Sequence, residues 1–261
     1  MLLVIDAGNT NTVFAVFSGE KLIGQWRMAT DARRTADEYC VWLLHIMAYE
    51  KIDPKKIKAA IMSSVVPQAN FALRMLARQY FHTELLIVGE PSVKLGIKAK
   101  IDRPAEVGAD RLVNAIAAWH KFNKPLVIVD FGTATTFDIV DNHGDYIGGV
   151  IAPGVNLSLE ALHRAAAKLP NVAVERPAHV IGKDTISAMQ SGIYFGYVSL
   201  IEGIVKRVIA EYGKKMGVIA TGGLAPLFAK ATTVIDALEP DLIIDGLKLI
   251  YEKNRKQGNI K

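Results

Sequence analysis

The sequence contains a single cysteine, Cys40, among its 261 residues. An internal disulfide is therefore excluded, and the chain suits a reducing compartment better than a secreted location. The chain also lacks any run of 18 apolar residues, the length that a membrane-spanning helix requires. The apolar start, residues 1–5, ends at Asp6 and is too short for the core of a signal peptide. We therefore expect a cytoplasmic protein with no membrane partner.

Other signatures of function are also missing. The six histidines are scattered without the spacing of a zinc site, and no Gly-x-Ser-x-Gly nucleophile elbow occurs. The net charge is +5, but the basic stretches 54–58 and 252–261 contain no interleaved aromatic residues. Such stretches are typical of solvated surfaces, so we expect no nucleic-acid partner. With 51% hydrophobic and 22% charged residues, the composition is that of a globular protein of one or two domains.

The chain does contain a repeated phrase. "VIDAGNTNTVFAVF" at residues 4–17 returns as "IVDFGTATTFDIV" at residues 128–140. In each copy an apolar run ends in an aspartate, a glycine stands two positions later, and a second apolar run follows small polar residues. The pattern predicts a strand, a tight turn and a second strand in both copies. The alignment pairs Asp6 with Asp130, Gly8 with Gly132, Asn9 with Thr133, and Thr12 with Thr136.

Strands and helices alternate after each copy. Thr35 and Glu38 have the spacing of a capping box, which predicts that a helix begins there. In the first half we expect strands near 2–7, 12–18, 22–28, 57–66 and 84–89, and helices near 35–50, 68–80 and 104–121. In the second half we expect strands near 126–131, 135–141, 145–151 and 217–221, and helices near 155–167, 184–212 and up to 252.

This alternation predicts an α/β protein with two mixed β-sheet domains flanked by helices. The repeat places the domains at residues 1–121 and 122–261, joined by a short turn at 121–125.

The repeated turns have the chemistry of an anion site. Glycine permits tight turns and close approach of a ligand, and successive backbone N–H groups form a concavity that suits anions. A carboxylate at the strand end can hold a cation against phosphate oxygens. One Asp-x-Gly turn is weak support because these residues fill ordinary turns, but two copies followed by "TGG" at 221–223 favour binding of a nucleotide's phosphates. Further side-chain donors are expected from Asn9, Thr10, Asn11 and Thr12 in the first copy and from Thr133, Thr135 and Thr136 in the second.

Seven segments in a fixed order carry a resemblance to a known family. They are "DAGNTNTVF", "PAEVGADRLVNA", "DFGTATTFDIV", "GGVIAPG", "AKLPNV", "GKDT" and "TGG". The chain resembles the type III pantothenate kinases, a bacterial family of the actin-like ATPase and sugar-kinase superfamily. The resemblance implies a duplicated actin-like ATPase (ribonuclease H-like) fold. It also implies ATP-dependent phosphorylation of pantothenate to 4'-phosphopantothenate, the first step of coenzyme A synthesis.

The resemblance also assigns roles to residues. It implies that Asp110 is the general base, that Asp6 holds Mg²⁺, and that Asp130 holds a monovalent cation, K⁺ or ammonium. It further implies a homodimer with its sites near the interface. The implied ATP-binding residues are Asp6, Ala7, Gly8, Asn9, Thr10, Asn11, Thr12, Val13 and Thr133. The implied pantothenate-binding residues are Gly108, Ala109, Asp110, Arg111, Thr185 and Ile101.

The residues alone leave other interpretations open. Asp110 and Arg111 would also fit the surface of the helix expected at 104–121, in which Gly108 would cost up to about 1 kcal/mol relative to alanine. Thr185 would also fit a helix N-cap. Ile101 stands where many family members carry a tyrosine, and no P-loop lysine follows the first turn. A phosphohydrolase of the same fold and a non-enzymatic nucleotide-binding regulator remain the alternative functions.

Overall fold

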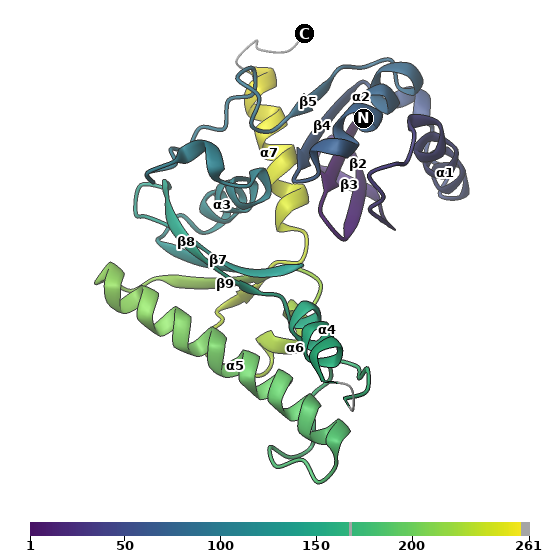
Figure 1. Ribbon diagram of the computed structural model, residues 1–261. Helices are drawn as coiled ribbons and strands as arrows, with labels where there is room; N and C mark the ends of the chain where they lie inside the picture. Colours follow the sequence, from purple (N-terminus) through teal and green to yellow (C-terminus); the bar gives the residue numbers. More distant parts are fainter. Residues whose placement is uncertain (167–168, 257–261) are drawn as a thin grey trace. The chain divides into compact units, whose positions relative to one another are not determined.

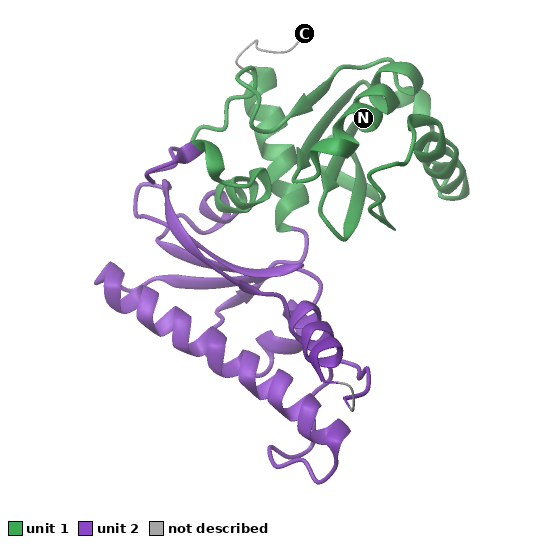
Figure 2. Cartoon of the chain, viewed as in Figure 1, with its two compact units in different colours: residues 1–97, 105–117, 242–261 green, residues 98–104, 118–241 purple. Residues whose placement is uncertain are grey.

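The computed structural model describes residues 1–166 and 169–256, which form two compact units (Figure 2). Unit 1 contains residues 1–97, 105–117 and the C-terminal residues from Leu242 onward. Unit 2 contains residues 98–104 and 118–241. Each unit is built around a five-stranded mixed sheet.

The sheet of unit 1 begins with an antiparallel meander. Its strands are β1 (Leu2–Ala7), β2 (Asn11–Ser18), β3 (Lys21–Ala29), β4 (Ala59–Ser64) and β5 (Leu85–Ile87), in the spatial order β3-β2-β1-β4-β5. Strand β4 pairs with β1 in parallel, and β5 pairs in parallel with β4. The chain must therefore cross over between β3 and β4 and again between β4 and β5, and a helix makes each crossover.

Two helices cover each face of this sheet. Helices α1 (Ala36–Tyr49) and α2 (Pro67–Tyr80) follow β3 and β4, whereas α3 (Ala109–Phe122, within unit 1 up to Ala117) and α7 (Leu242–Lys256) come later in the chain. Alternate residues of each strand point to opposite faces. One face therefore packs Leu3, Ile5 and Phe14 with Tyr39, Leu43, Leu73 and Leu76 of α1 and α2. The other packs Leu2, Val4 and Val13 with Val113, Leu247 and Ile250 of α3 and α7.

The sheet of unit 2 repeats this arrangement. Its strands are β6 (Leu126–Phe131), β7 (Ala134–Val140), β8 (Tyr146–Pro153), β9 (Gly217–Thr221) and β10 (Ala237–Leu238). The spatial order is β10-β9-β6-β7-β8, with β6 antiparallel to β7 and parallel to β9. Matching β6 to β1 gives the same order and the same strand directions as in unit 1, which confirms two mixed sheets built on one plan.

In the described part of the chain, three helices belong to unit 2 alone. They are α4 (Val155–Ala165), α5 (Thr185–Tyr212) and the short α6 (Ala225–Ala229). Figure 1 shows α5 running along one side of the sheet, where Ile201 and Val205 pack with Val127 and Val129 of β6. Within the described residues, none of the helices is both long enough and apolar enough to cross a membrane.

Most predicted elements are present, and one was placed wrongly. The capping box is confirmed: the Glu38 N–H donates to Thr35 Oγ1, and the Thr35 N–H donates to the Glu38 carboxylate. The helix expected at 104–121 is instead a 3-10 turn at Pro104–Glu106 followed by α3, which begins at Ala109. Gly108 therefore precedes the helix, and the cost of a glycine inside a helix does not apply. The prediction also missed α6 and β10, which are too short to show periodicity.

The compact units differ from the predicted halves at the C-terminus. Helix α7 lies in the second half of the sequence but packs with unit 1, where Ile244, Leu247 and Ile250 are buried. Gly246 permits close contact with α3, because a Cβ there would lie 2.6 Å from Val113 Cγ1. Helix α7 continues through Lys256, and residues 257–261 lie outside the described residues.

Candidate active site

The two Asp-x-Gly turns occupy equivalent places in the two sheets but differ in length. Asp6 pairs with Val13 across β1 and β2, and the Gly8 N–H donates to Asn11 O at 3.0 Å. Asp130 pairs with Thr136 across β6 and β7, and the second turn closes sooner, with the Gly132 N–H donating to Ala134 O at 3.1 Å.

The difference in length corrects the sequence alignment. Ala7 pairs with Thr12, and the equivalent Phe131 pairs with Thr135. The structural counterpart of Thr12 is therefore Thr135 and not Thr136. Periodicity could not reveal this because a turn can lose a residue without disturbing the strands on either side.

Neither glycine is explained by an unusual backbone angle. Neither Gly8 nor Gly132 has a positive φ. A Cβ on Gly8 would lie 3.1 Å from Asn11 O, which is shorter than an ordinary van der Waals contact. A Cβ on Gly132 would lie 3.5 Å from Ala134 O, which is an ordinary contact. Gly132 and its neighbour Thr133 are exposed, so the second turn leaves room for a ligand at its backbone.

The side chains of the turns divide into exposed and buried groups. Asn9, Thr10 and Thr133 are exposed and remain candidates for contact with a ligand. Thr12 and Thr135 are fully buried, which corrects the expectation that their hydroxyls are donors at the turn surface. Among the described residues, the Thr135 hydroxyl has no hydrogen-bonding partner.

Thr30, which sequence reasoning missed, supports the first turn. It follows the last residue of β3, and its N–H donates to Thr10 O at 3.0 Å. Its hydroxyl donates to Gly8 O at 2.7 Å and lies 2.9 Å from the Thr12 hydroxyl. No pattern in the sequence marks this residue, because an isolated threonine after a strand is common in loops.

Two glycines from other segments pack against the second turn. Gly222 of "TGG" has φ +93°, and a Cβ there would lie 2.5 Å from Asp130 Oδ1. Gly154, which ends "GGVIAPG", would place a Cβ 2.1 Å from Thr133 O. Unit 2 thus brings together three segments that the sequence analysis singled out separately.

Asp110 lies at the start of α3, in a tightly folded segment. The Gly108 carbonyl accepts from the Arg111 and Leu112 N–H groups at 3.1 and 3.3 Å. Asp110 Oδ1 accepts from the Arg111 N–H at 2.8 Å, and a Cβ on Gly108 would lie 2.5 Å from that oxygen. Glycine at position 108 leaves room for the Asp110 carboxylate to fold back over it, and a larger residue there would displace that carboxylate.

The environment of Asp110 differs from that of a surface aspartate. Burial raises the pKa of its carboxyl above the usual range, although the Arg111 N–H and the Arg111 charge act in the opposite direction. A carboxylate with a raised pKa binds a proton more readily than an exposed one. Asp110 is half-buried and is therefore not a fully solvated surface residue.

Unit 1 places Asp6 and Asp110 on the same side of its sheet. Asp6 alternates with Leu2 and Val4 along β1, and these residues face α3 and α7. Ala109 packs against the same apolar cluster. Asp130, Thr133, Thr185 and Ile101 belong to unit 2.

Thr185 is the first residue of α5 but does not cap the helix. The cap is Asp184, whose carboxylate accepts from the Ser187 N–H at 2.9 Å. Thr185 is exposed and lines a largely apolar hollow of about 550 Å³ together with Leu162, Met189 and Ile193. Its hydroxyl is therefore available to a ligand that has both polar and apolar groups.

Ile101 follows a segment that is fixed to unit 2. The side chain of the adjacent Lys100 bridges Asp141 at 2.9 Å and Asp145 at 2.8 Å. Ile101 itself is half-buried.

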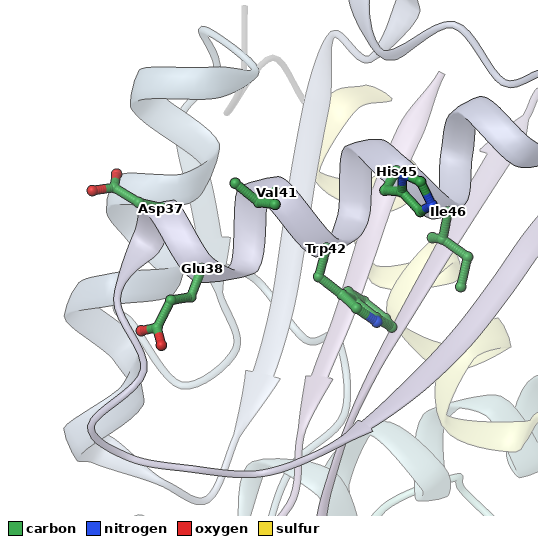
Figure 3. Close-up of a pocket in the computed structure, with 6 residues that line it drawn as sticks. All are labelled: Asp37, Glu38, Val41, Trp42, His45 and Ile46. Carbon is green, nitrogen blue, oxygen red and sulfur yellow. The ribbon is translucent and has the colours of Figure 1, made fainter.

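A second hollow, on α1, is a poor candidate for nucleotide binding (Figure 3). Its lining is mostly apolar, with two carboxylates and no lysine or arginine, so it would repel phosphates. Trp42 in this lining packs on Phe14, on the face of the sheet opposite to Asp6. The six lining residues are Asp37, Glu38, Val41, Trp42, His45 and Ile46.

The candidate metal residues fit a cation that draws most ligands from a bound nucleotide. Among residues 1–166 and 169–256, no three histidine, cysteine or acidic side chains gather as a metal site. Asp6 and Asp130 are instead single carboxylates at strand ends. Mg²⁺ is commonly held by one or two carboxylates plus phosphates and water, so this donor set suits it.

Comparison with known proteins agrees with the fold and the motifs. A solved structure from Sinorhizobium meliloti, described as a 2-dehydro-3-deoxygalactonokinase, aligns with a TM-score of 0.60 at 13% identity, covering 97% of this chain and 96% of that one. At this identity the likeness supports the fold alone, and it confirms the actin-like ATPase and sugar-kinase architecture.

The relatives in sequence are much closer. A type III pantothenate kinase of Rhodospirillum rubrum is 60% identical over 255 residues, covering 98% of this chain and 99% of that protein. One of Caulobacter vibrioides is 56% identical over 256 residues, covering 97% and 98%. The family model for type III pantothenate kinase matches residues 2–207. The chain therefore belongs to the type III pantothenate kinase family.

Proposed function

We propose that the protein transfers the γ-phosphoryl group of ATP to pantothenate, giving 4'-phosphopantothenate and ADP for coenzyme A synthesis. Family membership at 60% identity over almost the whole chain supports this substrate pair. The structural observation that carries the mechanism is the position of Asp110, a half-buried carboxylate in the first turn of α3, on the side of the sheet to which Asp6 points. A phosphoryl-transfer site needs such a group to take the proton of the attacking alcohol.

The reaction balances as an in-line displacement. The primary hydroxyl of pantothenate gives its proton to the Asp110 carboxylate, and its oxygen forms a bond to the γ-phosphorus. The bond between the γ-phosphorus and the β–γ bridging oxygen breaks, and ADP leaves with that oxygen. The protein contributes mainly by positioning and by stabilising negative charge.

The proposed pantothenate-binding residues come from three places in the chain. Gly108, Ala109 and Arg111 surround the base in sequence, and the planar guanidinium of Arg111 suits the carboxylate of pantothenate or the transferred phosphate. Thr185 and Ile101 complete the proposed set. The apolar hollow beside Thr185 suits the geminal methyl groups of pantothenate.

ATP is proposed to bind the backbone of the turn from Asp6 to Val13 and to contact Thr133. The first turn contains no lysine, so the negative charge of the ATP phosphates must be balanced by other groups. Asp6 would hold Mg²⁺ and Asp130 would hold K⁺ or ammonium, and Arg111 adds a fixed positive charge. When bound, these cations supply neutralisation of the phosphate charge.

The proposal includes the setting of the enzyme. We place it in the cytoplasm, in agreement with a single buried cysteine, and as a homodimer that acts on small molecules and not on nucleic acid.

The release of ADP with and without pantothenate tests the function. We expect release that depends on pantothenate and yields one phosphopantothenate per ADP. Equal release in both conditions would identify a phosphohydrolase instead. Binding of ATP with no release in either condition would identify a nucleotide-binding regulator.

A further inference from the structure

Thr30 makes three hydrogen-bonding contacts with one turn, and nothing in the proposed mechanism uses them. Its N–H donates to Thr10 O, its hydroxyl donates to Gly8 O, and the same hydroxyl meets that of Thr12. We propose that Thr30 is a positioning residue that sets the ATP-binding turn of Gly8–Asn11 in the conformation that receives phosphate. The proposal rests on the assignment of this turn to nucleotide binding.

Thr30 contacts the turn from the face of the sheet that α1 and α2 cover. Thr12 alternates with Phe14 and Val16 along β2, and these residues face α1 and α2. Asp6 lies on the opposite face, with Leu2 and Val4. A hydroxyl that bonds to Thr12 is therefore on the side away from the Asp6 carboxylate, so Thr30 influences a ligand through the backbone and not by touching it.

The peptide planes explain how the influence is transmitted. In a trans peptide the C=O and the following N–H point in opposite directions. Thr30 holds the carbonyls of Gly8 and Thr10, and the N–H groups of Asn9 and Asn11 must therefore point away from Thr30. Backbone N–H groups held in a common direction are what an anion-binding turn requires.

The second unit closes its hairpin without such a threonine. Ala29 pairs with Asn11 before Thr30, and Pro153 pairs with Ala134 before Gly154, so Gly154 is the counterpart of Thr30. Gly154 has no hydroxyl, and its Cα is too close to Thr133 O to carry a Cβ. The hairpin of unit 2 nevertheless closes, with a turn that is one residue shorter.

The presence of Gly154 in place of a threonine also explains why the buried Thr135 hydroxyl has no partner. Thr12 bonds to the hydroxyl of Thr30, whereas its counterpart Thr135 has only a glycine at the equivalent position and no partner for its Oγ1. The hydrogen-bonded pair of Thr12 and Thr30 hydroxyls is thus a feature that distinguishes the first turn from the second. We assign it to phosphate binding by the first turn and not to general stability.

Substitutions of Thr30 test the proposal by separating ATP from pantothenate. Thr30→Val keeps the shape and removes the hydroxyl, Thr30→Ser keeps the hydroxyl, and Thr83→Val is the matched control. Thr83 is also a half-buried threonine of unit 1, and its hydroxyl donates to Lys58 O at 3.3 Å. Titration calorimetry gives Kd for a non-hydrolysable ATP analogue with Mg²⁺, and steady-state kinetics give KM for pantothenate.

We expect Thr30→Val to raise the Kd of the analogue about tenfold, the effect of losing two modest hydrogen bonds. Thr30→Ser and Thr83→Val should stay within about twofold, and KM for pantothenate should not change by more than about twofold in any variant. Should Thr30→Val be unfolded by circular dichroism, Thr30→Ala is measured in the same way with the same expectation.

An unchanged Kd in a folded variant without the hydroxyl would overturn the role of Thr30. So would an equal loss of affinity for the analogue and for pantothenate, because that result indicates general damage to the fold. The wild-type assay separates this outcome from failure of the function itself. If the wild type binds the analogue but makes no phosphopantothenate, the kinase proposal fails while the calorimetric test of Thr30 still stands.

Discussion

At the scale of single residues, Asp110 combines two opposing requirements. An acid whose pKa is higher in the folded protein binds its proton more tightly there than in the unfolded chain. Asp110 therefore favours folding most at pH values below its unfolded pKa, and that contribution is lost as the pH rises through the folded pKa. The burial that makes the carboxylate a better base consequently makes the enzyme less stable at neutral pH.

Asp110→Asn should reveal both effects. We expect kcat to fall by at least ~100-fold, the lower range for loss of a general base. We also expect a higher Tm than the wild type at pH 7, with the difference shrinking as the pH approaches about 4, where an ordinary aspartate is protonated. Turnover assays measure kcat, and calorimetry between pH 4 and 8 measures Tm. Near-normal turnover would remove the base role, and an equal Tm across this range would contradict the burial effect.

Adjacent glycines offer a matched test of the second turn. Gly222→Ala should strain the left-handed backbone by about 1–3 kcal/mol and displace the Asp130 carboxylate, since the new Cβ would lie 2.5 Å from its Oδ1. Gly223→Ala should have little effect because nothing lies within 4 Å of its Cβ position. We expect only Gly222→Ala to lose stimulation of turnover by K⁺. An unchanged K⁺ response in this variant would count against Asp130 as the cation ligand.

At the scale of elements, the close approach of α7 to α3 depends on one position. Gly246→Ala would place a Cβ 2.6 Å from both Cγ1 and O of Val113. Overpacking of this kind costs about 1–3 kcal/mol of unfolding free energy. Gly196→Ala in α5 is the control: its Cβ meets no atom within 4 Å, so it should be neutral or stabilise by up to about 1 kcal/mol. Urea denaturation measures both, and equal stability of the two variants would contradict the packing argument.

Elements also show what the sequence could and could not predict. The repeat around Asp6 and Asp130 predicted both meanders because apolar periodicity and turn residues are local properties. The assignment of α7 to unit 1 could not be predicted, since an amphipathic pattern reports that a helix is covered but not by which sheet. The resemblance carried by the segment "PAEVGADRLVNA" led to Asp110, whereas Thr30 escaped notice because its proposed role depends on three contacts that only the folded hairpin creates.

At the scale of the whole molecule, the proposed homodimer requires an apolar surface. Beside Thr185 in the chain, Ile181 and Ile186 are 82% and 51% exposed. Isolated exposed apolar residues are common, but two beside a proposed substrate site suit an interface that covers it. Ile181→Asp combined with Ile186→Asp should therefore shift the protein toward monomer. Val41→Asp, at a residue of α1 that is 72% exposed, should leave the mass unchanged.

Light scattering after size-exclusion chromatography measures the mass of each variant. A wild type that runs as a monomer would exclude the homodimer. If the double variant remained dimeric, Ile181 and Ile186 would not belong to the dimer interface.

The position of α7 has a consequence for how the protein is made. Helix α7 follows β1–β5 and the whole of residues 118–241 in the chain, yet it covers Leu2 and Val4 of β1. During synthesis, the nascent sheet of unit 1 therefore keeps one side without its final cover until residues 242–256 have been made. Folding of unit 1 is completed only then, whereas the strands and helices of residues 118–241 can assemble earlier.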